Sequence, residues 1–163
     1  MVSRRLSREA GHRRKFLAIV DDTPECERAI AYAARRAQTT GGALLLLFVI
    51  EPGEVQHWLG VEQIMREEAQ ATASAALDLQ AGKVRLELGL EPELVTREGK
   101  ADEEIHALIE EDQDIAILVL AASSSKEGPG PLVSAIAGKG AAFPIPVTVV
   151  PSTLSDEDIE AIA

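Results

Sequence analysis

Residues 15–25 read KFLAIVDDTPE, and they carry the clearest signature of the fold. Residues 16–20 form a short apolar run without polar alternation, which is typical of a β-strand covered on both faces. A helix start follows: Thr23 suits the N-cap, Pro24 the first helical position, and Glu25 the positive end of the helix dipole. A buried strand that runs directly into a helix predicts a βα unit.

The same alternation continues along the rest of the chain. The first helix is predicted to run until the segment 39–42, which contains two glycines. Further strands are predicted at 43–50, 93–97, 115–121 and 145–150. Further helices are predicted at 61–80, 101–111 and 132–142, and 54–60 is predicted to be a loop.

Residues 84–90 fit two structures. They alternate as a strand would, yet Leu77, Ala81, Val84 and Leu88 continue a helical stripe. Gly89 then stands where a helix often ends. The helix is favoured.

Alternating strands and helices predict the fold class. It is an α/β domain with a single doubly wound, five-stranded parallel sheet and helices on both faces. A length of 163 residues favours one such domain. Ligands of these folds bind beyond the carboxyl ends of the strands. Three segments are therefore of interest: 21–23, 49–52 and 121–134.

Composition excludes several classes of function. The net charge of -11 argues against nucleic-acid and anionic-membrane partners, because phosphate contacts need clustered Lys and Arg. No apolar run approaches the roughly 20 residues of a membrane-spanning helix. The run at 16–20 is also too short for the core of a signal peptide. The single cysteine, Cys26, permits no internal disulfide and fits a reducing compartment, so a cytoplasmic location is expected.

The two ends carry opposite charge. Residues 1–15 hold six basic residues and one acid, whereas residues 152–163 hold four acids and no base. We predict a basic tail at 1–14, a domain at 15–151 and an acidic tail at 152–163. Exposed ion pairs contribute only about 0–1 kcal/mol each, so the basic arm is expected to be mobile. Binding of an acidic partner by this arm is the alternative.

Four segments in order resemble the universal stress protein family over residues 15–151. Residues 20–23, VDDT, resemble the family's V-D-x-S pattern, and 95–105 resemble its strand, glycine and helix leading to the fourth strand. Residues 114–120 and 144–150 resemble its last two strands. The resemblance implies the strand order 3-2-1-4-5 and a homodimer through the fifth strand, Ile145 to Val150.

The family's ATP-binding members carry a G-x2-G-x9-G-[ST] loop after the fourth strand, and this chain departs from it. The three glycine positions fall on Ala121, Ser124 and Ser134. Gly128 and Gly130 are shifted, and each is followed by a proline without an N–H donor. The resemblance therefore implies ATP or AMP as a weakly bound ligand at most, and no firm cofactor.

Two residues after the first strand are candidate ligand contacts. Asp21 matches the family's adenosine-contacting acid, and a solvated loop acid is an equal alternative. Thr23 fits a helix cap better than a ligand contact. The candidate binding residues are Asp21, Thr23, Val49, Ala121, Ser123, Ser124, Ser125, Lys126 and Ser134. Residues 123–126 offer three hydroxyls and a cation to a small anion, or else form a plain polar loop.

No catalytic residues are visible. Cys26 is either a thiol activated by the helix dipole or a small buried residue, and burial is favoured. His12, His57 and His106 have no metal-ligand spacing. The sequence predicts a non-enzymatic stress-response or regulatory protein that binds a nucleotide or small anion weakly or not at all. The alternative is an adenine-nucleotide enzyme on a related fold, of adenylating, ATP-pyrophosphatase or flavoprotein-subunit type. The pyrophosphatase type requires an S-G-G-x-D-S loop, whereas residues 21–24 are DDTP.

Overall fold

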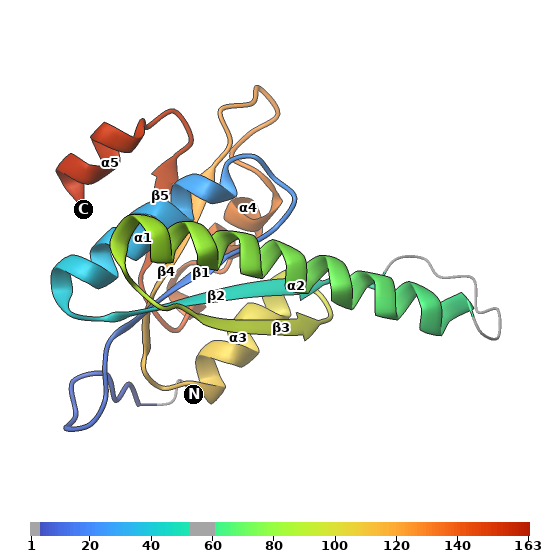
Figure 1. Ribbon diagram of the computed structural model, residues 1–163, viewed down its shortest axis with the longest axis horizontal. Coiled ribbons are helices and arrows are strands. Elements are labelled where there is room, and N and C mark those ends of the chain that lie inside the picture. The colour runs from blue at the N-terminus through green and yellow to red at the C-terminus, as the bar shows by residue number, and fades with distance from the viewer. Residues whose placement is uncertain (1–3, 53–60) are drawn as a thin grey trace.

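A computed structural model describes residues 4–52 and 61–163, and its centre is one parallel sheet of five strands (Figure 1). The strand order is β3-β2-β1-β4-β5, which confirms the predicted order 3-2-1-4-5. All four neighbouring pairs are parallel. The strands are β1 (Lys15–Ile19), β2 (Ala43–Ile50), β3 (Glu93–Glu98), β4 (Ile115–Ala122) and β5 (Val147–Pro151).

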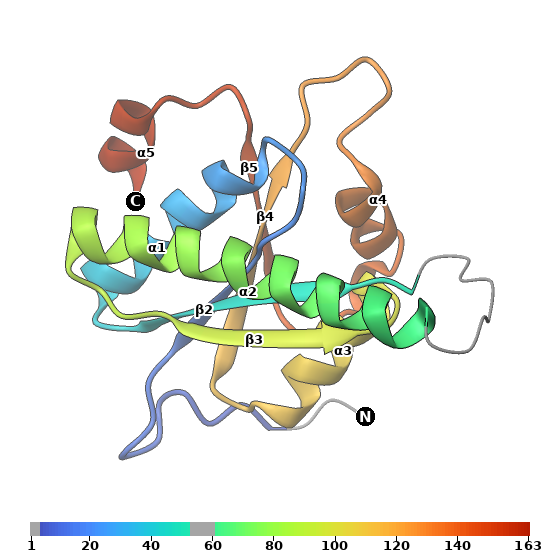
Figure 2. The same ribbon diagram turned by 45° about the vertical axis from the view of Figure 1, so that its right-hand side comes forward.

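Helices cover both faces of the sheet (Figure 2). On one face lie α1 (Cys26–Thr40) and α2 (Val61–Leu88), and on the other α3 (Ala101–Glu111) and α4 (Pro131–Ala137). A 3-10 turn, η1 (Gly140–Ala142), and a last helix, α5 (Asp156–Ile162), complete the described structure. In the part of the chain that the structure describes, no helix has the length and apolar character to cross a membrane.

The core consists of two clusters separated by the sheet. Phe16 and Leu46 face the α1 side, and Leu17 and Leu45 face the α3 side. Each of these four side chains is at most 1% exposed. Burial on both faces explains why β1 and β2 are continuous apolar runs rather than alternating ones.

The predicted start of the first helix is wrong. Thr23 does not cap the helix, because α1 begins at Cys26 and its N-cap position is Glu25. The Thr23 backbone N–H and hydroxyl both donate to Asp21 Oδ1 instead. The Thr23 hydroxyl, which an N-cap would use for the helix backbone, is thus bonded to the Asp21 side chain two residues upstream.

Other boundaries follow or modify the prediction. The choice of helix for 84–90 is confirmed: α2 runs to Leu88, and Gly89 has a φ of +64°. The helix predicted for 132–142 is shorter, because it ends at Ala137 and a separate 3-10 turn follows. The fifth strand begins at Val147 rather than Ile145, because Pro146 has no N–H for the ladder. The loop predicted for 54–60 lies outside the described residues.

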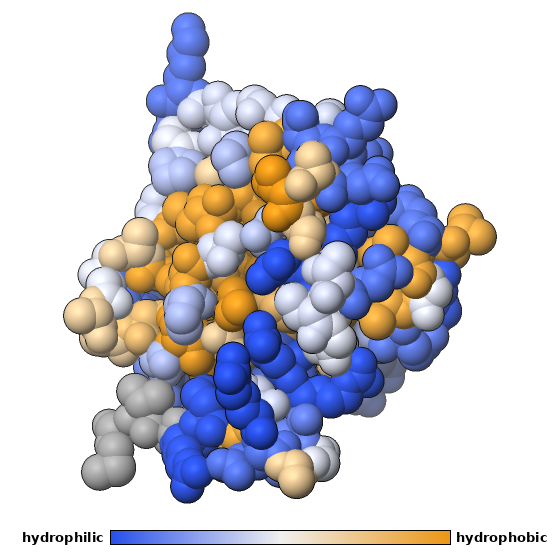
Figure 3. Space-filling model, turned by 90° about the vertical axis from the view of Figure 1, so that its left-hand side faces the viewer, coloured by the Kyte–Doolittle hydropathy of each residue, from blue (hydrophilic) through white to orange (hydrophobic). Residues whose placement is uncertain are grey.

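The sheet has two edges, and β5 forms one of them. In Figure 3, apolar side chains gather across the middle of the side on which β5 and α5 lie in Figure 1. Val149 of β5 is 44% exposed on this side.

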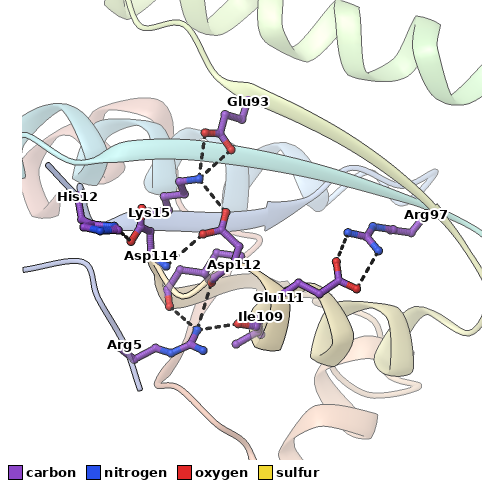
Figure 4. A network of polar contacts seen from close by, with 10 residues as sticks. Arg5, His12, Lys15, Glu93, Arg97, Ile109, Glu111, Asp112 and Asp114 are labelled. Atoms are coloured by element: carbon purple, nitrogen blue, oxygen red, sulfur yellow. Dashed lines mark hydrogen bonds and ion pairs between the residues drawn. The ribbon is translucent and has the colours of Figure 1, made fainter. Parts of the chain in front are cut away.

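The N-terminal arm lies against the amino end of the sheet (Figure 4). The Arg5 guanidinium donates to three carbonyl oxygens, at 2.7 Å from Ile109, 3.1 Å from Ile115 and 3.3 Å from Asp112. His12 Nδ1 lies 2.7 Å from Asp114 Oδ1. The prediction of a mobile arm did not foresee these contacts, which come from the α3–β4 connection and not from the acidic C-terminal residues.

The C-terminal acidic segment is folded onto α1. Ser155 and Asp158 form a reciprocal capping box, and Ile159 is completely buried. Arg28 Nη1 of α1 lies 2.8 Å from Asp156 Oδ1, and Thr39 Oγ1 donates to the Ala163 carbonyl at 3.0 Å. The four acids are thus part of a capped helix, in which first-turn acids favour the positive end of the dipole.

Candidate functional site

The candidate site is a cleft at the carboxyl ends of β1 and β4. The strand order reverses between these two strands, which is where ligands bind in doubly wound folds. Ile19, Val119 and Leu120 form the strand side of the cleft. The β1–α1 turn lines one side and residues 129–133 line the other.

Asp21 is the central polar residue of the cleft. Its Oδ1 accepts hydrogen bonds from the Thr23 backbone N–H at 2.9 Å and from Thr23 Oγ1 at 2.5 Å. Burial raises the pKa of the Asp21 carboxyl above its ordinary value, and the two bonds from Thr23 oppose that rise. Asp21 is therefore a fixed hydrogen-bond acceptor rather than a freely solvated loop acid.

The charge of the cleft is unfavourable for phosphate. Its lining includes two acids, Asp21 and Glu25, and no lysine or arginine among the residues that the structure describes. A Cβ added to Gly130 would lie 3.9 Å from Glu25 Oε1, so this carboxylate faces the loop directly. A polyphosphate placed here would meet negative charge without a compensating cation.

The cleft is also small. Its volume is about 40 Å³, well below the roughly 300–1,000 Å³ of small-molecule pockets. Pro129, Pro131 and Leu132 are among its lining residues. A nucleotide therefore requires a wider cleft than this one.

Several backbone donors of the loop after β4 bond within the loop. The Ser123 N–H donates to the Pro129 carbonyl at 3.0 Å. The Ser125 N–H donates to Ser123 Oγ at 3.1 Å, and the Glu127 N–H to Ser125 Oγ at 3.1 Å. These backbone donors close the loop on itself instead of pointing at a ligand.

The glycines of the loop lie at new positions. Gly128 and Gly130 have φ values of +110° and +106°, whereas no described non-glycine residue has a positive φ. Ala121 belongs to β4 and Ser134 to α4, so both have ordinary backbone geometry. The substituted positions are therefore unstrained, and the loop follows a different course from one that needs glycine there.

The structure brings together only part of the predicted site. Asp21, Thr23 and Ala121 line the cleft. The other six do not line it: Val49, Ser123, Ser124, Ser125, Lys126 and Ser134. Val49 packs against the core on the α3 side, and Ser124 to Lys126 are exposed. Sequence reasoning missed Glu25 and Gly130; the Gly130–Pro131 pair ahead of α4 was the available signal.

Cys26 and the two described histidines, His12 and His106, supply no chemistry at this cleft, and His57 lies outside the described residues. Cys26 is buried, its thiol donates to the Asp21 carbonyl at 3.6 Å, and burial raises its pKa to about 11. That confirms the buried-residue interpretation over an activated thiol. His106 packs edge-on against Phe143, with ring centroids 6.2 Å apart. Within residues 4–52 and 61–163, no group of three or more His, Cys, Asp or Glu could hold a metal ion.

Comparisons with known proteins agree with this fold. The model of the universal stress protein family matches residues 12–151. Universal stress protein UspA from Lactobacillus plantarum superposes with a TM-score of 0.69 at 19% identity, over 84% of this chain and 97% of that one. A comparison with curated proteins finds no match.

Two further solved structures carry ligands. A universal stress protein in complex with cAMP has a TM-score of 0.65 at 15% identity, over 86% of this chain and 98% of that one. An Arabidopsis thaliana family protein with AMP bound has a TM-score of 0.56 at 16% identity, over 88% and 94%. The structures share the fold, and the family model covers most of the sequence. The chain belongs to the universal stress protein family.

Proposed function

We propose that this chain is a non-enzymatic, cytoplasmic stress-response or regulatory protein that binds adenine nucleotides weakly or not at all. One observation carries the proposal: the cleft between β1 and β4 is narrow, has two carboxylates and no cation in its described lining, and faces a loop that uses its own donors. The single buried cysteine fits the reducing environment of the cytoplasm.

The cleft suits the adenosine part of a nucleotide better than the phosphate part. Two hydrogen bonds from Thr23 fix the Asp21 carboxylate, so a hydrogen-bond acceptor is held at the end of β1. Relatives of the same fold bind cAMP and AMP, which supports an adenosine-type ligand. A nucleoside or monophosphate therefore suits this chain better than a triphosphate.

No observation favours the enzyme alternative. Asp21 hydrogen-bonds to the Thr23 hydroxyl, but no histidine or lysine that could act as a base is among the described lining residues of the cleft. The Cys26 thiol beside it is protonated at neutral pH, because burial raises its pKa to about 11.

The proposal includes a homodimer through the β5 edge. Val133, Ile136, Phe143, Val147 and Val149 line an apolar groove of about 370 Å³ beside this strand. Unpaired backbone groups of an edge strand next to exposed apolar side chains favour pairing with a second copy. Val149→Lys should dissociate the dimer, as measured by sedimentation equilibrium; an unchanged assembly would refute the β5 interface.

The proposed ligand is tested by mass spectrometry of small molecules that copurify with the protein, followed by NMR titration with AMP. We expect no stoichiometric ligand, and weak, fast-exchange shifts confined to residues around Asp21, Ala121 and Gly130. Asp21→Ala is the matched control and should abolish those shifts. A copurified flavin or an adenylated product would overturn the proposal in favour of an enzyme.

A further inference from the structure

The outer face of α2 carries an unusual number of exposed apolar side chains. Leu86 is 88% exposed and Leu79 is 59% exposed. Toward the start of the helix, Ile64 is 58% and Met65 47% exposed. In Figure 3, apolar side chains protrude at the right-hand margin, where the C-terminal end of α2 lies.

Met65, Leu79 and Leu86 belong to a regular row, and Ile64 lies next to it in the sequence. Successive members are alternately four and three residues apart: Val61, Met65, Glu68, Thr72, Ala75, Leu79, Gly82 and Leu86. This 4-3 alternation is the spacing of the two core positions of a coiled coil. The residues that hold α2 on the sheet, Ala73, Leu77 and Val84, lie on the opposite side of the helix. The helix thus has two contact faces, of which the fold uses one.

Gly82 supplies independent support. It lies inside the helix, where glycine is destabilising relative to alanine. A Cβ added at this position would meet nothing within 4 Å, so packing within the chain does not require the glycine. The absence of a side chain suits the close approach of a second helix from outside.

We propose that the outer row of α2 packs against the same row of a second copy of this chain, in antiparallel orientation. The 4-3 spacing is the same read from either end, so the row can pair with itself about a two-fold axis. Met65 then lies opposite Gly82 of the other copy, and Thr72 opposite Ala75, which places larger side chains against smaller ones.

Charge favours the antiparallel orientation over the parallel one. In a parallel pair Glu68 would face Glu68 of the other copy, and like charges in a partly buried layer are costly. In the antiparallel pair Glu68 lies opposite Leu79, one helical turn from Lys83 of the second copy. The N-terminal half of the helix, with Glu67 and Glu68, is thereby brought toward the C-terminal end, where Lys83 already pairs with Glu27 and Arg85 with Glu91.

The size of the contact predicts a weak association. A helix of 28 residues is about 42 Å long. With a width of about 10 Å, the contact covers roughly 400 Å² on each copy. The total of roughly 800 Å² is below the about 1,200 Å² of stable specific interfaces and falls in the range of weak, transient ones. Used together with the β5 edge, it would join dimers into larger assemblies.

The test is sedimentation equilibrium at protein concentrations up to several hundred micromolar, with wild type and with Val149→Lys, which removes the β5 contact. We expect Val149→Lys to keep a weak monomer–dimer equilibrium. Adding Leu79→Lys or Leu86→Lys should weaken this association at least tenfold. Ser74→Lys, which places the same charge on an exposed α2 residue outside the row, should leave it unchanged. A strictly monomeric Val149→Lys protein, or equal effects of Leu79→Lys and Ser74→Lys, would overturn the proposal.

Disulfide formation tests the orientation. In a Cys26→Ala background, Met65→Cys and Gly82→Cys proteins are oxidised separately and as a mixture. The antiparallel pair predicts a crosslinked heterodimer in the mixture and little crosslinking of either protein alone. Efficient crosslinking of Met65→Cys with itself would indicate a parallel pair, and no crosslinking in the mixture would contradict the contact; both results reject the proposal.

Discussion

The two ends of the sheet use charge in opposite ways. At the amino end, Arg5 and Lys15 make charged contacts with groups far away in the sequence, on α3, β3 and the α3–β4 connection (Figure 4). At the carboxyl end, Asp21 and the serines of the β4–α4 loop bond to residues two positions away. Arg5 therefore fastens the arm and Lys15 ties β1 to its neighbours, while the cleft where a phosphate would bind has no lysine or arginine in its described lining. A strand order that creates a ligand crevice does not by itself create a nucleotide site.

The largest expected effect on stability comes from removing the Arg5 contacts at the amino end of the sheet. Arg5→Ala removes a charged donor from three carbonyl oxygens, including that of Ile109 in the last turn of α3. Hydrogen bonds to charged groups contribute about 1.5–3 kcal/mol, so the free energy of unfolding should fall by about 2 kcal/mol. Urea denaturation measures this. Arg8→Ala, at an exposed position of the same arm, is the control and should cost less than about 0.5 kcal/mol. Equal effects would mean that the Arg5 contacts do not stabilise the fold.

The next largest effect is expected on ATP binding, when a cation is placed in the cleft at the carboxyl end of the sheet. Glu25→Lys replaces a negative by a positive charge in the cleft lining, so ATP binding should tighten about tenfold, which is about 1.4 kcal/mol. Calorimetric titration measures it. Glu157→Lys makes the same charge change on α5, outside the cleft, and should have little effect. Equal gains in both variants would show that net charge, not cleft charge, limits binding.

Restoring glycine distinguishes a strained loop from a differently folded one. Because Ser134 lies in α4 with ordinary backbone geometry, Ser134→Gly should lower the free energy of unfolding by about 0.5 kcal/mol and give no gain in ATP affinity. The triple variant Ala121→Gly, Ser124→Gly, Ser134→Gly should likewise show no gain in ATP affinity. Thermal denaturation and calorimetry measure the two effects. A tenfold gain in affinity would show that the missing glycines alone disable the loop.

The smallest effect concerns the charge on Asp21. Because burial raises its pKa in the folded protein, the folded state holds this proton more tightly than the unfolded state, and stability is lost as the pH rises through that pKa. Asp21→Asn, which can still accept from Thr23, should therefore be slightly more stable than wild type at pH 7. The difference should vanish below about pH 4, near the ordinary pKa of aspartate. Urea denaturation at both pH values measures it; a variant less stable at pH 7 would contradict the burial argument.

The sheet could be predicted because its signals are local. Strands such as 43–50 are continuous apolar runs, and the stripe through Leu77, Val84 and Leu88 correctly extended α2. The Asp21–Thr23 pair is also local, since the partners are two positions apart in the sequence. The docked arm and the closed loop could not be predicted, because they depend on pairs such as Arg5 with Ile109 and Ser123 with Pro129 whose geometry no periodicity encodes. Distance along the chain limited the prediction of the arm, whereas the course of the β4–α4 loop limited the prediction of the site.

The most direct test of the central claim is a calorimetric comparison of adenosine, AMP and ATP binding to the unmodified protein at one salt concentration. The described lining of the cleft offers an acceptor to adenosine and no cation to phosphate, and several backbone N–H groups of the β4–α4 loop are bonded within the loop. We therefore predict that ATP binds no more tightly than adenosine, with a dissociation constant no lower than roughly 0.1 mM, which corresponds to about 5.5 kcal/mol. Micromolar binding of ATP, with affinity rising from adenosine through AMP to ATP, would contradict the account.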